Sequence, residues 1–186
     1  MTLVGLHGDI GAGKDTVASY FVQHGFQKES FASPLKDVTS TIFGWPRALL
    51  EGDTVYSREW REAPSTWWAQ QLGIPDFTPR LAMSVVGTDA FRNRVHKDIW
   101  VLAMERRLAL IPDNVVVSDV RYQNEADMIR RLGGTVIEVL RPGFESHNTH
   151  PANTQKVTCD AHFCNSGSLE TVKFFVSDYL NKIEPS

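Results

Sequence analysis

The stretch Gly8-Asp9-Ile10-Gly11-Ala12-Gly13-Lys14-Asp15-Thr16 decides the predicted fold, because it follows the apolar run 3–6 and precedes a helix-like run, 17–22. A strand, a glycine-rich loop ending in lysine and a helix together form a P-loop. The glycines let backbone N–H groups surround phosphate oxygens, the helix N-terminus adds a positive dipole, and Lys14 reaches the β- and γ-phosphates. A flexible N-terminal turn would not explain a lysine at this spacing. The sequence therefore predicts a site for a nucleoside triphosphate.

One position departs from the usual pattern. The Ser or Thr that normally follows the lysine, and whose hydroxyl binds Mg²⁺, is replaced by Asp15, with Thr16 next. Asp15 is therefore a candidate metal ligand. The spacing leaves open whether Asp15 or Thr16 contacts the metal, or whether the hydroxyl contact is missing.

The composition is that of an ordinary globular protein. With 186 residues, 42% apolar and 22% charged, the chain is expected to form one domain with a substantial core. The net charge of −3 argues against a nucleic-acid polymer as partner, and no apolar run is long enough for a membrane helix. The chain shows no signal peptide, and Cys159 and Cys164 are too few for a disulfide framework and lack metal-ligand spacing. We therefore expect reduced cysteines and a cytoplasmic protein with no membrane partner.

Strands alternate with helices along the chain, which is typical of a doubly wound, mostly parallel α/β sheet. The expected strands are 3–6, 26–31, 115–118, 135–140 and 157–164. The expected helices after the P-loop helix are 33–43, 79–91, 98–110, 122–132 and 169–183, the last capped by Ser168.

The composition changes between residues 44 and 79, where prolines, aromatic residues and charges follow no simple periodicity. We interpret this stretch as a lid-like or substrate-facing segment with short helices. The expected organisation is a single domain, 1–186, with a helical substrate-binding insertion at about 44–110 and a lid loop at 141–157.

A second site signal is Val115-Val116-Val117-Ser118-Asp119-Val120-Arg121. A carboxylate at the end of a buried strand beside the P-loop strand fits a position that holds Mg²⁺, directly or through water. Arg121 points the same way as Asp119 if the strand continues, and would bind a phosphate; Glu125 lies one helical turn further. The alternative is an aspartate that caps a helix with an ordinary salt bridge between Arg121 and Glu125.

A third signal runs from Arg80 to Trp100. Gly87 and Thr88 interrupt an apolar helix face and would let a ligand approach the backbone closely. Trp100 would stack on a base, and the arginines of this stretch would bind a second phosphate. The alternative is a helical hairpin with solvated arginines and a core tryptophan.

These motifs together resemble the phage-type deoxynucleoside monophosphate kinases, a family of P-loop nucleotide kinases. They are the P-loop, Phe-Ala-Ser-Pro-Leu-Lys at 31–36, Val-Gly-Thr-Asp at 86–89, Asp-Ile-Trp at 98–100 and Ser-Asp-Val-Arg-Tyr-Gln-Asn-Glu at 118–125. The resemblance runs from residue 3 to about 140 and resumes at 165–169. It implies a three-layer α/β/α, adenylate-kinase-like P-loop fold, transfer of the γ-phosphoryl group of ATP to a deoxynucleoside monophosphate with Mg²⁺, and a homodimer. The chain would act in the cytoplasm, that of the host if it is viral.

The resemblance also implies roles for individual residues. Lys14, Arg121 and Asp119 would be catalytic, and Asp119 and Asp15 would hold the metal. The implied ATP-binding residues are Gly8, Gly11, Ala12, Gly13, Lys14, Asp15, Thr16, Asn165 and Gly167. The implied residues for the acceptor nucleotide are Lys14, Arg80, Gly87, Thr88, Trp100, Asp119, Arg121 and Glu125. Arg92 and Arg141 are further candidate cations, the latter as a lid arginine or as a solvated side chain.

Two alternatives keep the P-loop but change the function. Other small-molecule P-loop kinases, of the dephospho-coenzyme A or phosphomevalonate type, would share residues 8–16 without a reason for Trp100 as a base platform. A P-loop ATPase switch would instead have a basic nucleic-acid surface, which the net charge does not favour. Which bases are accepted, and what the 44–79 segment and the 146–150 loop do, is not encoded in any motif.

Overall fold

The computed structural model describes residues 1–143 and 157–183. Within it the chain forms two compact units, one made of Met1–Phe31 with Met104–Ser186, the other of Ala32–Ala103. The second unit thus begins and ends earlier than the insertion expected at 44–110. The expected lid loop at 141–157 lies largely outside the described residues, as does all of the 146–150 loop.

The first unit contains a five-stranded sheet in the order β2-β3-β1-β4-β5. Every pair of neighbouring strands is parallel, which confirms the predicted α/β architecture. The bounds are β1 Leu3–His7, β2 Gln27–Glu29, β3 Val115–Val120, β4 Thr135–Leu140 and β5 Ala161–Cys164. Because β1 is central and β3 is its neighbour, the P-loop and Asp119 follow adjacent strand ends, as the sequence predicted.

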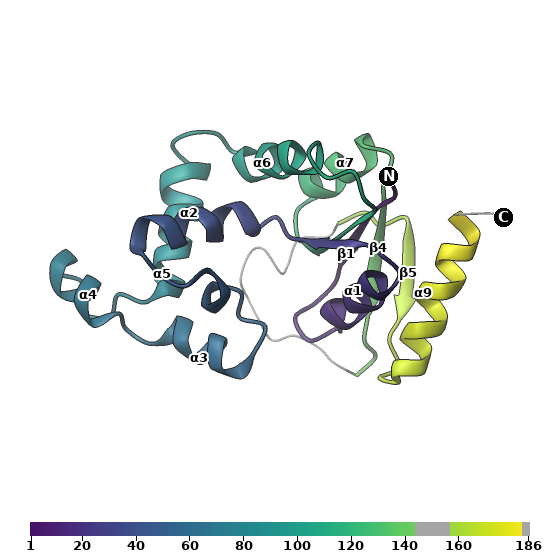
Figure 1. Cartoon of the computed structure of the whole chain (residues 1–186), viewed down its shortest axis with the longest axis horizontal. Coiled ribbons are helices and arrows are strands. Elements are labelled where there is room, and N and C mark those ends of the chain that lie inside the picture. Colours follow the sequence, from purple (N-terminus) through teal and green to yellow (C-terminus); the bar gives the residue numbers. More distant parts are fainter. Residues whose placement is uncertain (144–156, 184–186) are drawn as a thin grey trace. The chain divides into compact units, whose positions relative to one another are not determined.

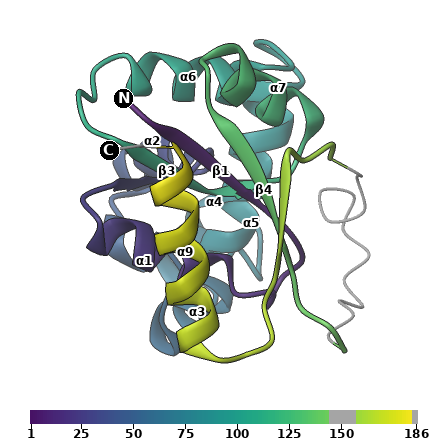
Figure 2. The same ribbon diagram turned by 90° about the vertical axis from the view of Figure 1, so that its right-hand side faces the viewer.

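Helices cover both faces of this sheet, so the first unit has three layers (Figures 1 and 2). On one face lie α1 (Lys14–Gln23) and α9 (Leu169–Ile183), side by side and joined by an edge-on ring contact between Phe21 and Tyr179 at 5.9 Å. Val4 and Leu6 of β1 enter the same fully buried cluster as the apolar residues of these two helices. Burial of such side chains is the main favourable term that holds the layers together.

The opposite face carries α7 (Gln123–Arg131) and the C-terminal part of α6 (Ile99–Leu108). Gly5 of β1 makes room for α7, because a Cβ there would lie 2.5 Å from Cδ1 of Ile129. An ion pair of 2.6 Å between Arg131 and Glu105 links α7 to α6. Successive residues of β1 therefore face opposite layers: Val4 and Leu6 face α1 and α9, and Gly5 faces α7.

The second unit is helical throughout. It contains α2 (Ser33–Phe43), η1 (Arg47–Leu50), α3 (Val55–Glu62), α4 (Thr66–Leu72), α5 (Pro79–Ser84) and η2 (Val85–Arg92). Its core combines Trp45, Leu50 and Phe77, from the stretch that followed no periodicity, with Ala82 and Met83 of α5. Phe43 stacks on Trp45 with ring centroids 4.5 Å apart. The aromatic residues of 44–79 therefore build a small core among short helices.

Several elements differ in length from the expectation. The strands expected at 26–31 and 157–164 are shorter, at Gln27–Glu29 and Ala161–Cys164. The helix expected at 79–91 is an α-helix for one and a half turns and then a π-helix, Val85–Arg92. A switch of helix type leaves no mark in hydrophobic periodicity, and π-helical turns occur often at functional sites.

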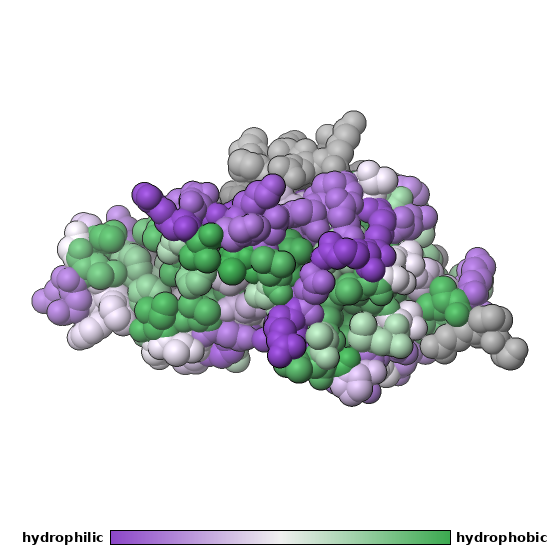
Figure 3. All heavy atoms as spheres, turned by 90° about the horizontal axis from the view of Figure 1, so that it is seen from above, coloured by the Kyte–Doolittle hydropathy of each residue, from purple (hydrophilic) through white to green (hydrophobic). Residues whose placement is uncertain are grey.

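Some large apolar side chains remain exposed, among them Trp67 (60%), Leu72 (46%) and Ile74 (42%) in the second unit. On the face drawn in Figure 3, apolar residues form separate patches among hydrophilic ones. Among the helices in the described part of the chain, none combines the length and the apolar character that a membrane span requires.

Candidate active site

The P-loop occupies the turn between β1 and α1, where its backbone is too compact for side chains at two glycines. Gly8 has a φ of 142°, and a Cβ there would lie 2.3 Å from the carbonyl oxygen of Val139 in β4. Gly13 has a φ of 98° and is the N-cap of α1. Such a loop at a helix N-terminus presents backbone N–H groups to an anion. The residues predicted from the motif are therefore arranged as an anion cradle.

Lys14 and Arg121 meet at a hollow beside this loop, lined also by His7, Gly8 and Asp9. Lys14 Nζ donates hydrogen bonds to the carbonyl oxygens of Gly8 at 2.6 Å and Asp9 at 2.7 Å. Burial, followed by the positive charge of Arg121, lowers the pKa of Lys14. A partly desolvated Lys14 beside the like charge of an exposed Arg121 forms a site that an anion would stabilise.

The backbone that places Arg121 at this hollow differs from the one expected. The strand β3 ends at Val120, so Arg121 does not continue the alternation that would align it with Asp119. Instead its backbone N–H is held by Glu125 Oε2 at 2.7 Å. The same oxygen accepts the N–H of Tyr122 at 3.1 Å, and Glu125 is only 3% exposed. Glu125 therefore closes the first turn of α7 and fixes the backbone that carries Arg121.

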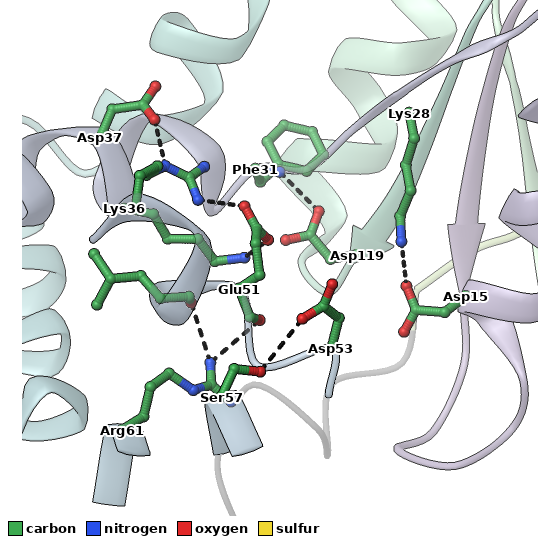
Figure 4. Close-up of polar contacts among 12 residues, drawn as sticks. Asp15, Lys28, Phe31, Lys36, Asp37, Glu51, Asp53, Ser57, Arg61 and Asp119 are labelled. Atoms are coloured by element: carbon green, nitrogen blue, oxygen red, sulfur yellow. Dashed lines mark hydrogen bonds and ion pairs between the residues drawn. The ribbon is translucent and has the colours of Figure 1, made fainter. Parts of the chain in front are cut away.

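Asp119 lies near the end of β3, and its Oδ1 accepts a hydrogen bond of 2.7 Å from the backbone N–H of Phe31 (Figure 4). The carboxylate also acts on Lys14, whose pKa it raises against the larger effects of burial and Arg121. Lys14 and Arg121 thus line the hollow, and the charges of Asp119 and Arg121 both act on Lys14. The predicted catalytic residues of the first unit are therefore brought together.

Asp15, the candidate in place of the usual hydroxyl residue, forms an ion pair of 2.7 Å with Lys28 of β2 (Figure 4). Its side chain is 83% exposed. Thr16 lines a second hollow, on the side of the P-loop that faces α9. No motif marks Lys28, because β2 carries none and only the fold brings this lysine to Asp15.

The second hollow contains the loop that the sequence singled out before α9. It is lined by Gly13, Thr16, Arg141, Asn165, Gly167, Ser168, Leu169 and Val172. Asn165 is 6% exposed and donates from Nδ2 to the carbonyl oxygen of Ala12 at 2.8 Å. Arg141 donates to the carbonyl oxygen of Gly11 at 3.1 Å. Both residues therefore contact the backbone of the P-loop, and Arg141 is not simply solvated.

Mg²⁺ would need oxygen ligands at this site, and the carboxylates Asp119 and Asp15 are the candidates. No group of three or more His, Cys, Asp or Glu side chains suited to a metal exists among residues 1–143 and 157–183. Mg²⁺ in phosphoryl-transfer sites needs fewer protein ligands, since one or two carboxylates plus phosphate oxygens and water suffice. Asp119 fits that demand. Asp15 fits it less well, because Lys28 already neutralises it.

In the second unit, Trp100 and Gly87 contact each other directly. Trp100 Nε1 donates to the carbonyl oxygen of Gly87 at 2.9 Å, and its ring lies 5.4 Å from that of Phe91. Trp100 is only 7% exposed. A Cβ on Gly87 would lie 2.9 Å from Cδ2 of Leu35, so a side chain of α2 uses the space that we expected a ligand to need.

The other residues predicted for the acceptor lie on the surface of this unit. Thr88 is exposed on the π-helix next to Gly87. Arg80 in α5 has a side chain 57% exposed, with its Nε 3.8 Å from Glu62. Arg61 of α3 adds a cation that the sequence reasoning did not consider, and burial together with the charge of Arg80 lowers its pKa. Lys36 and Arg47 both bind Glu51 nearby in the same unit (Figure 4).

Known proteins of one kinase family resemble this chain in sequence. The sequence pattern of the family described as Deoxynucleotide monophosphate kinase matches residues 70–175. A protein of Acanthamoeba polyphaga mimivirus, whose name places it in the same family, is 34% identical over 202 residues, which cover 99% of this chain and 97% of that protein. The deoxynucleoside-5'-monophosphate kinase of Escherichia phage T5 is 25% identical over 98% of this chain and 90% of its own.

The fold has a counterpart among solved structures. Shikimate kinase of Aquifex aeolicus superposes with a TM-score of 0.51 over the full length of both chains, at 10% identity. At that identity the likeness concerns the fold alone, and it confirms the predicted P-loop kinase architecture. The matched residues 70–175 contain Gly87, Trp100 and Asp119, which belong to the motifs that carried the resemblance in the sequence. The chain belongs to the deoxynucleotide monophosphate kinase family.

Proposed function

We propose that this protein transfers the γ-phosphoryl group of ATP to a deoxynucleoside monophosphate, giving the diphosphate and ADP. Family membership over nearly the whole chain supports the reaction class. The observation that carries the proposal is the pairing of Lys14 with Arg121 at the P-loop, where the burial of Lys14 and its repulsion by Arg121 favour a bound polyanion.

The donor is assigned to the first unit. The P-loop residues Gly8, Gly11, Ala12 and Gly13 would surround the phosphates through their backbone, and Lys14 would contact the transferred group. The second hollow, lined by Thr16, Asn165 and Gly167, would take the nucleoside part of ATP. This assignment is supported by the arrangement of both hollows on the same loop, since Gly13 and Lys14 are neighbours in sequence and line different hollows.

The acceptor is assigned to Arg80, Gly87, Thr88 and Trp100, with Asp119, Arg121 and Glu125 acting near its phosphate. Within this set we distinguish two roles. Arg80 and Thr88 are exposed and would touch the nucleotide, whereas Trp100 and Glu125 are buried and hydrogen-bonded to backbone groups. Trp100 would therefore act mainly by holding the π-helix at Gly87, and Glu125 by holding Arg121.

Mg²⁺ is proposed as the cofactor, held by Asp119 together with phosphate oxygens, with Asp15 as a second candidate. When bound, the ion would neutralise charge on the β- and γ-phosphates. Asp119 is kept in place by the N–H of Phe31, so one carboxylate oxygen already has a fixed direction. The chain's own contribution is thus an oriented carboxylate beside two cations.

The chemistry needs little proton transfer. An oxygen of the acceptor's phosphate forms a bond to the γ-phosphorus while the bond from that phosphorus to the β–γ bridging oxygen breaks, and ADP leaves with the electron pair. A phosphate monoester is already a competent nucleophile, so alignment and charge stabilisation are the main demands. Lys14 and Arg121 would supply the charge, and no general base is assigned.

The direct test is a coupled assay of ADP formation with ATP, Mg²⁺ and each of the four deoxynucleoside monophosphates in turn. We expect turnover that depends on the acceptor, with ADP and the deoxynucleoside diphosphate formed in equal amounts. Turnover with dephospho-coenzyme A or phosphomevalonate alone would favour another small-molecule kinase. Slow ATP hydrolysis that ignores every acceptor would favour a P-loop switch.

Two further expectations stay proposals. The protein would act in the cytoplasm, that of the host if it is viral, which the phage and mimivirus relatives support. It would form a homodimer, for which the exposed Trp67, Leu72 and Ile74 offer apolar surface. Sedimentation at micromolar concentration tests the dimer, and a single species of monomer mass would contradict it.

A further inference from the structure

Asn165 holds a position that the P-loop motif does not describe, where three segments meet. Its backbone N–H donates to the carbonyl oxygen of Leu140 at the end of β4, at 2.7 Å. Its side chain donates from Nδ2 to Ala12 in the P-loop at 2.8 Å and accepts from the N–H of Gly167 at 3.1 Å. With 6% exposure, this amide has both polar ends satisfied by backbone.

The bond to Ala12 determines how the P-loop presents its next N–H group. No cis peptide occurs among the described residues, so in the peptide that joins Ala12 to Gly13 the C=O and N–H point in opposite directions. Since Asn165 binds the C=O of Ala12, the N–H of Gly13 must point away from Asn165. The side chain therefore fixes the direction of one of the groups that would bind phosphate.

Gly13 shows that this contact is tightly fitted. A Cβ at Gly13 would lie 2.3 Å from Asn165 Nδ2, so the amide fills the space that only a glycine leaves. Through Oδ1 the same side chain binds the N–H of Gly167, which lines the second hollow with Gly13 and Thr16. One side chain thus contacts both the P-loop and the loop that precedes α9 beside the second hollow.

We propose that Asn165 is a positioning residue for the donor nucleotide. It supports ATP binding by orienting the peptide between Ala12 and Gly13 in the P-loop, and it does not contact the base. This inference rests on the proposed function, in that it takes ATP as the ligand of the P-loop. It goes further by assigning the amide a mechanism and by predicting which part of the ligand depends on it.

The test replaces the donor end of the amide and leaves the acceptor end. In Asn165→Asp, an oxygen faces the carbonyl oxygen of Ala12 in place of the N–H donor, and at pH 8 the two oxygens repel, although the other carboxylate oxygen keeps the N–H of Gly167. We expect the Kd for ATP, measured by calorimetry, to rise about tenfold or more relative to wild type at that pH. Ser166→Ala, which changes an exposed neighbour in the same loop, should stay within about twofold.

Lowering the pH should restore binding in this variant. A protonated carboxyl group can donate to Ala12 as the amide does, and burial raises the pKa of the new side chain. At pH about 5.5 the variant should therefore return to within about threefold of wild type at the same pH. The titratable and charged groups on the surrounding segments include Asp9, Lys14 and Asp15 at the P-loop, the pair Glu138 and His162 on β4 and β5, Arg141, and Glu170 on α9. Normalising to wild type at each pH removes their titration.

Inorganic tripolyphosphate separates positioning from base contact. We expect the variant to lose affinity for tripolyphosphate by the same factor as for ATP, because the P-loop N–H is misdirected for both. Unchanged tripolyphosphate binding, unchanged ATP binding at pH 8, or a defect that persists at pH 5.5 would each overturn the inference. If Asn165→Asp does not fold, Asn165→Ala removes both bonds without a charge, and binding of either ligand within twofold of wild type overturns it.

Failure of the proposed function gives a different result. If wild-type protein binds ATP but phosphorylates no deoxynucleoside monophosphate, the acceptor assignment fails, while the comparison of ATP with tripolyphosphate still tests Asn165.

Discussion

The two units of this protein build their candidate binding residues in different ways. In the first unit the candidate site combines the P-loop backbone with charged side chains, and buried side chains such as Asn165 and Glu125 hold backbone segments in place. In the second unit the candidate residues stand on short helices around an aromatic cluster that includes Trp45 and Phe77. The first unit therefore depends on loop geometry and the second on helix packing.

This difference predicts how each unit responds to substitution. Removing a charge from the P-loop unit should abolish the reaction and leave folding intact, since the loop is fixed by other contacts. Removing packing from the helical unit should weaken folding of that unit and, through it, binding of the acceptor. Substitutions in the two units should thus separate donor effects from acceptor effects.

The largest effect is expected for Lys14→Ala. The ammonium group sits at the hollow with Arg121, and its loss removes a charge that would stabilise the transferred phosphoryl group. We expect kcat/KM to fall by about 10³-fold or more. The coupled assay measures the loss, and circular dichroism checks that the fold is kept. Lys182→Ala, which removes an exposed cation of α9, is the control; full activity in Lys14→Ala would break the comparison.

Arg121→Lys should have the next largest effect. It keeps the positive charge but removes the planar guanidinium that can donate two parallel hydrogen bonds to a phosphate. We expect kcat/KM to fall by about 10²-fold with thermal stability unchanged, because Glu125 binds the backbone of residue 121 and not its side chain. Arg131→Lys on α7 is the matched control, since that arginine pairs with Glu105 on the surface. Equal losses in both variants would mean that Arg121 has no special role.

Leu50→Ala tests the helical unit. Leu50 has no exposed surface and belongs to the aromatic cluster, so its truncation leaves a cavity. We expect unfolding free energy to fall by about 3 kcal/mol, measured by denaturant titration. Leu72→Ala in α4, where the leucine is 46% exposed, should lower the unfolding free energy far less.

The affinity of Leu50→Ala for ATP should stay within about twofold of wild type, because the donor residues belong to the other unit. A tenfold loss would show that the two units do not separate in this way.

The sequence predicted the first unit more completely than the second, and the reason is physical. The P-loop spacing and the apolar run before Asp119 are local patterns, so Lys14, Asp119 and Arg121 could be assigned from them. The pairing of Asp15 with Lys28, and the bond from Asn165 to Ala12, join residues distant in the chain and leave no local pattern.

In the second unit the sequence suggested short helices but not their packing. Clustered aromatic residues are compatible with a ligand surface or with a core, and Trp45 proved to belong to a core. Trp100 was likewise expected as a base platform, yet its N–H is bound to Gly87 and its ring is buried. Periodicity also could not reveal the π-helix at Val85–Arg92, since it depends on backbone hydrogen bonds alone.

Trp100→Phe tests how the π-helix of the second unit supports binding of the acceptor. The substitution keeps an aromatic ring and removes the donor that binds the carbonyl oxygen of Gly87. Loss of this bond loosens the π-helix that carries Thr88, so we expect the KM for the acceptor to rise about fivefold while the KM for ATP stays within about twofold. Initial-rate kinetics with each substrate varied in turn measure the two constants. Trp67→Phe, at an exposed tryptophan, is the control. A rise in the KM for ATP alone would assign Trp100 to the donor.

The smallest effect concerns the two cysteines, which the structure places in different surroundings. Cys159 is partly buried, and burial together with the charge of Glu138 raises its pKa to about 11, whereas Cys164 is exposed. At pH 8 only about one Cys159 thiol in a thousand is the reactive thiolate, and this fraction grows roughly tenfold for each pH unit toward 11. Iodoacetamide at pH 8, followed by peptide mass analysis, should therefore label Cys164 first, and raising the pH to 9.5 should accelerate labelling of Cys159.

Because neither thiol lies among the residues assigned to catalysis, labelling of Cys164 should leave activity unchanged. Faster labelling of Cys159 than of Cys164 at pH 8 would mean that the segment before β5 is open in solution, and that the first unit is less firmly fixed than its hydrogen bonds indicate.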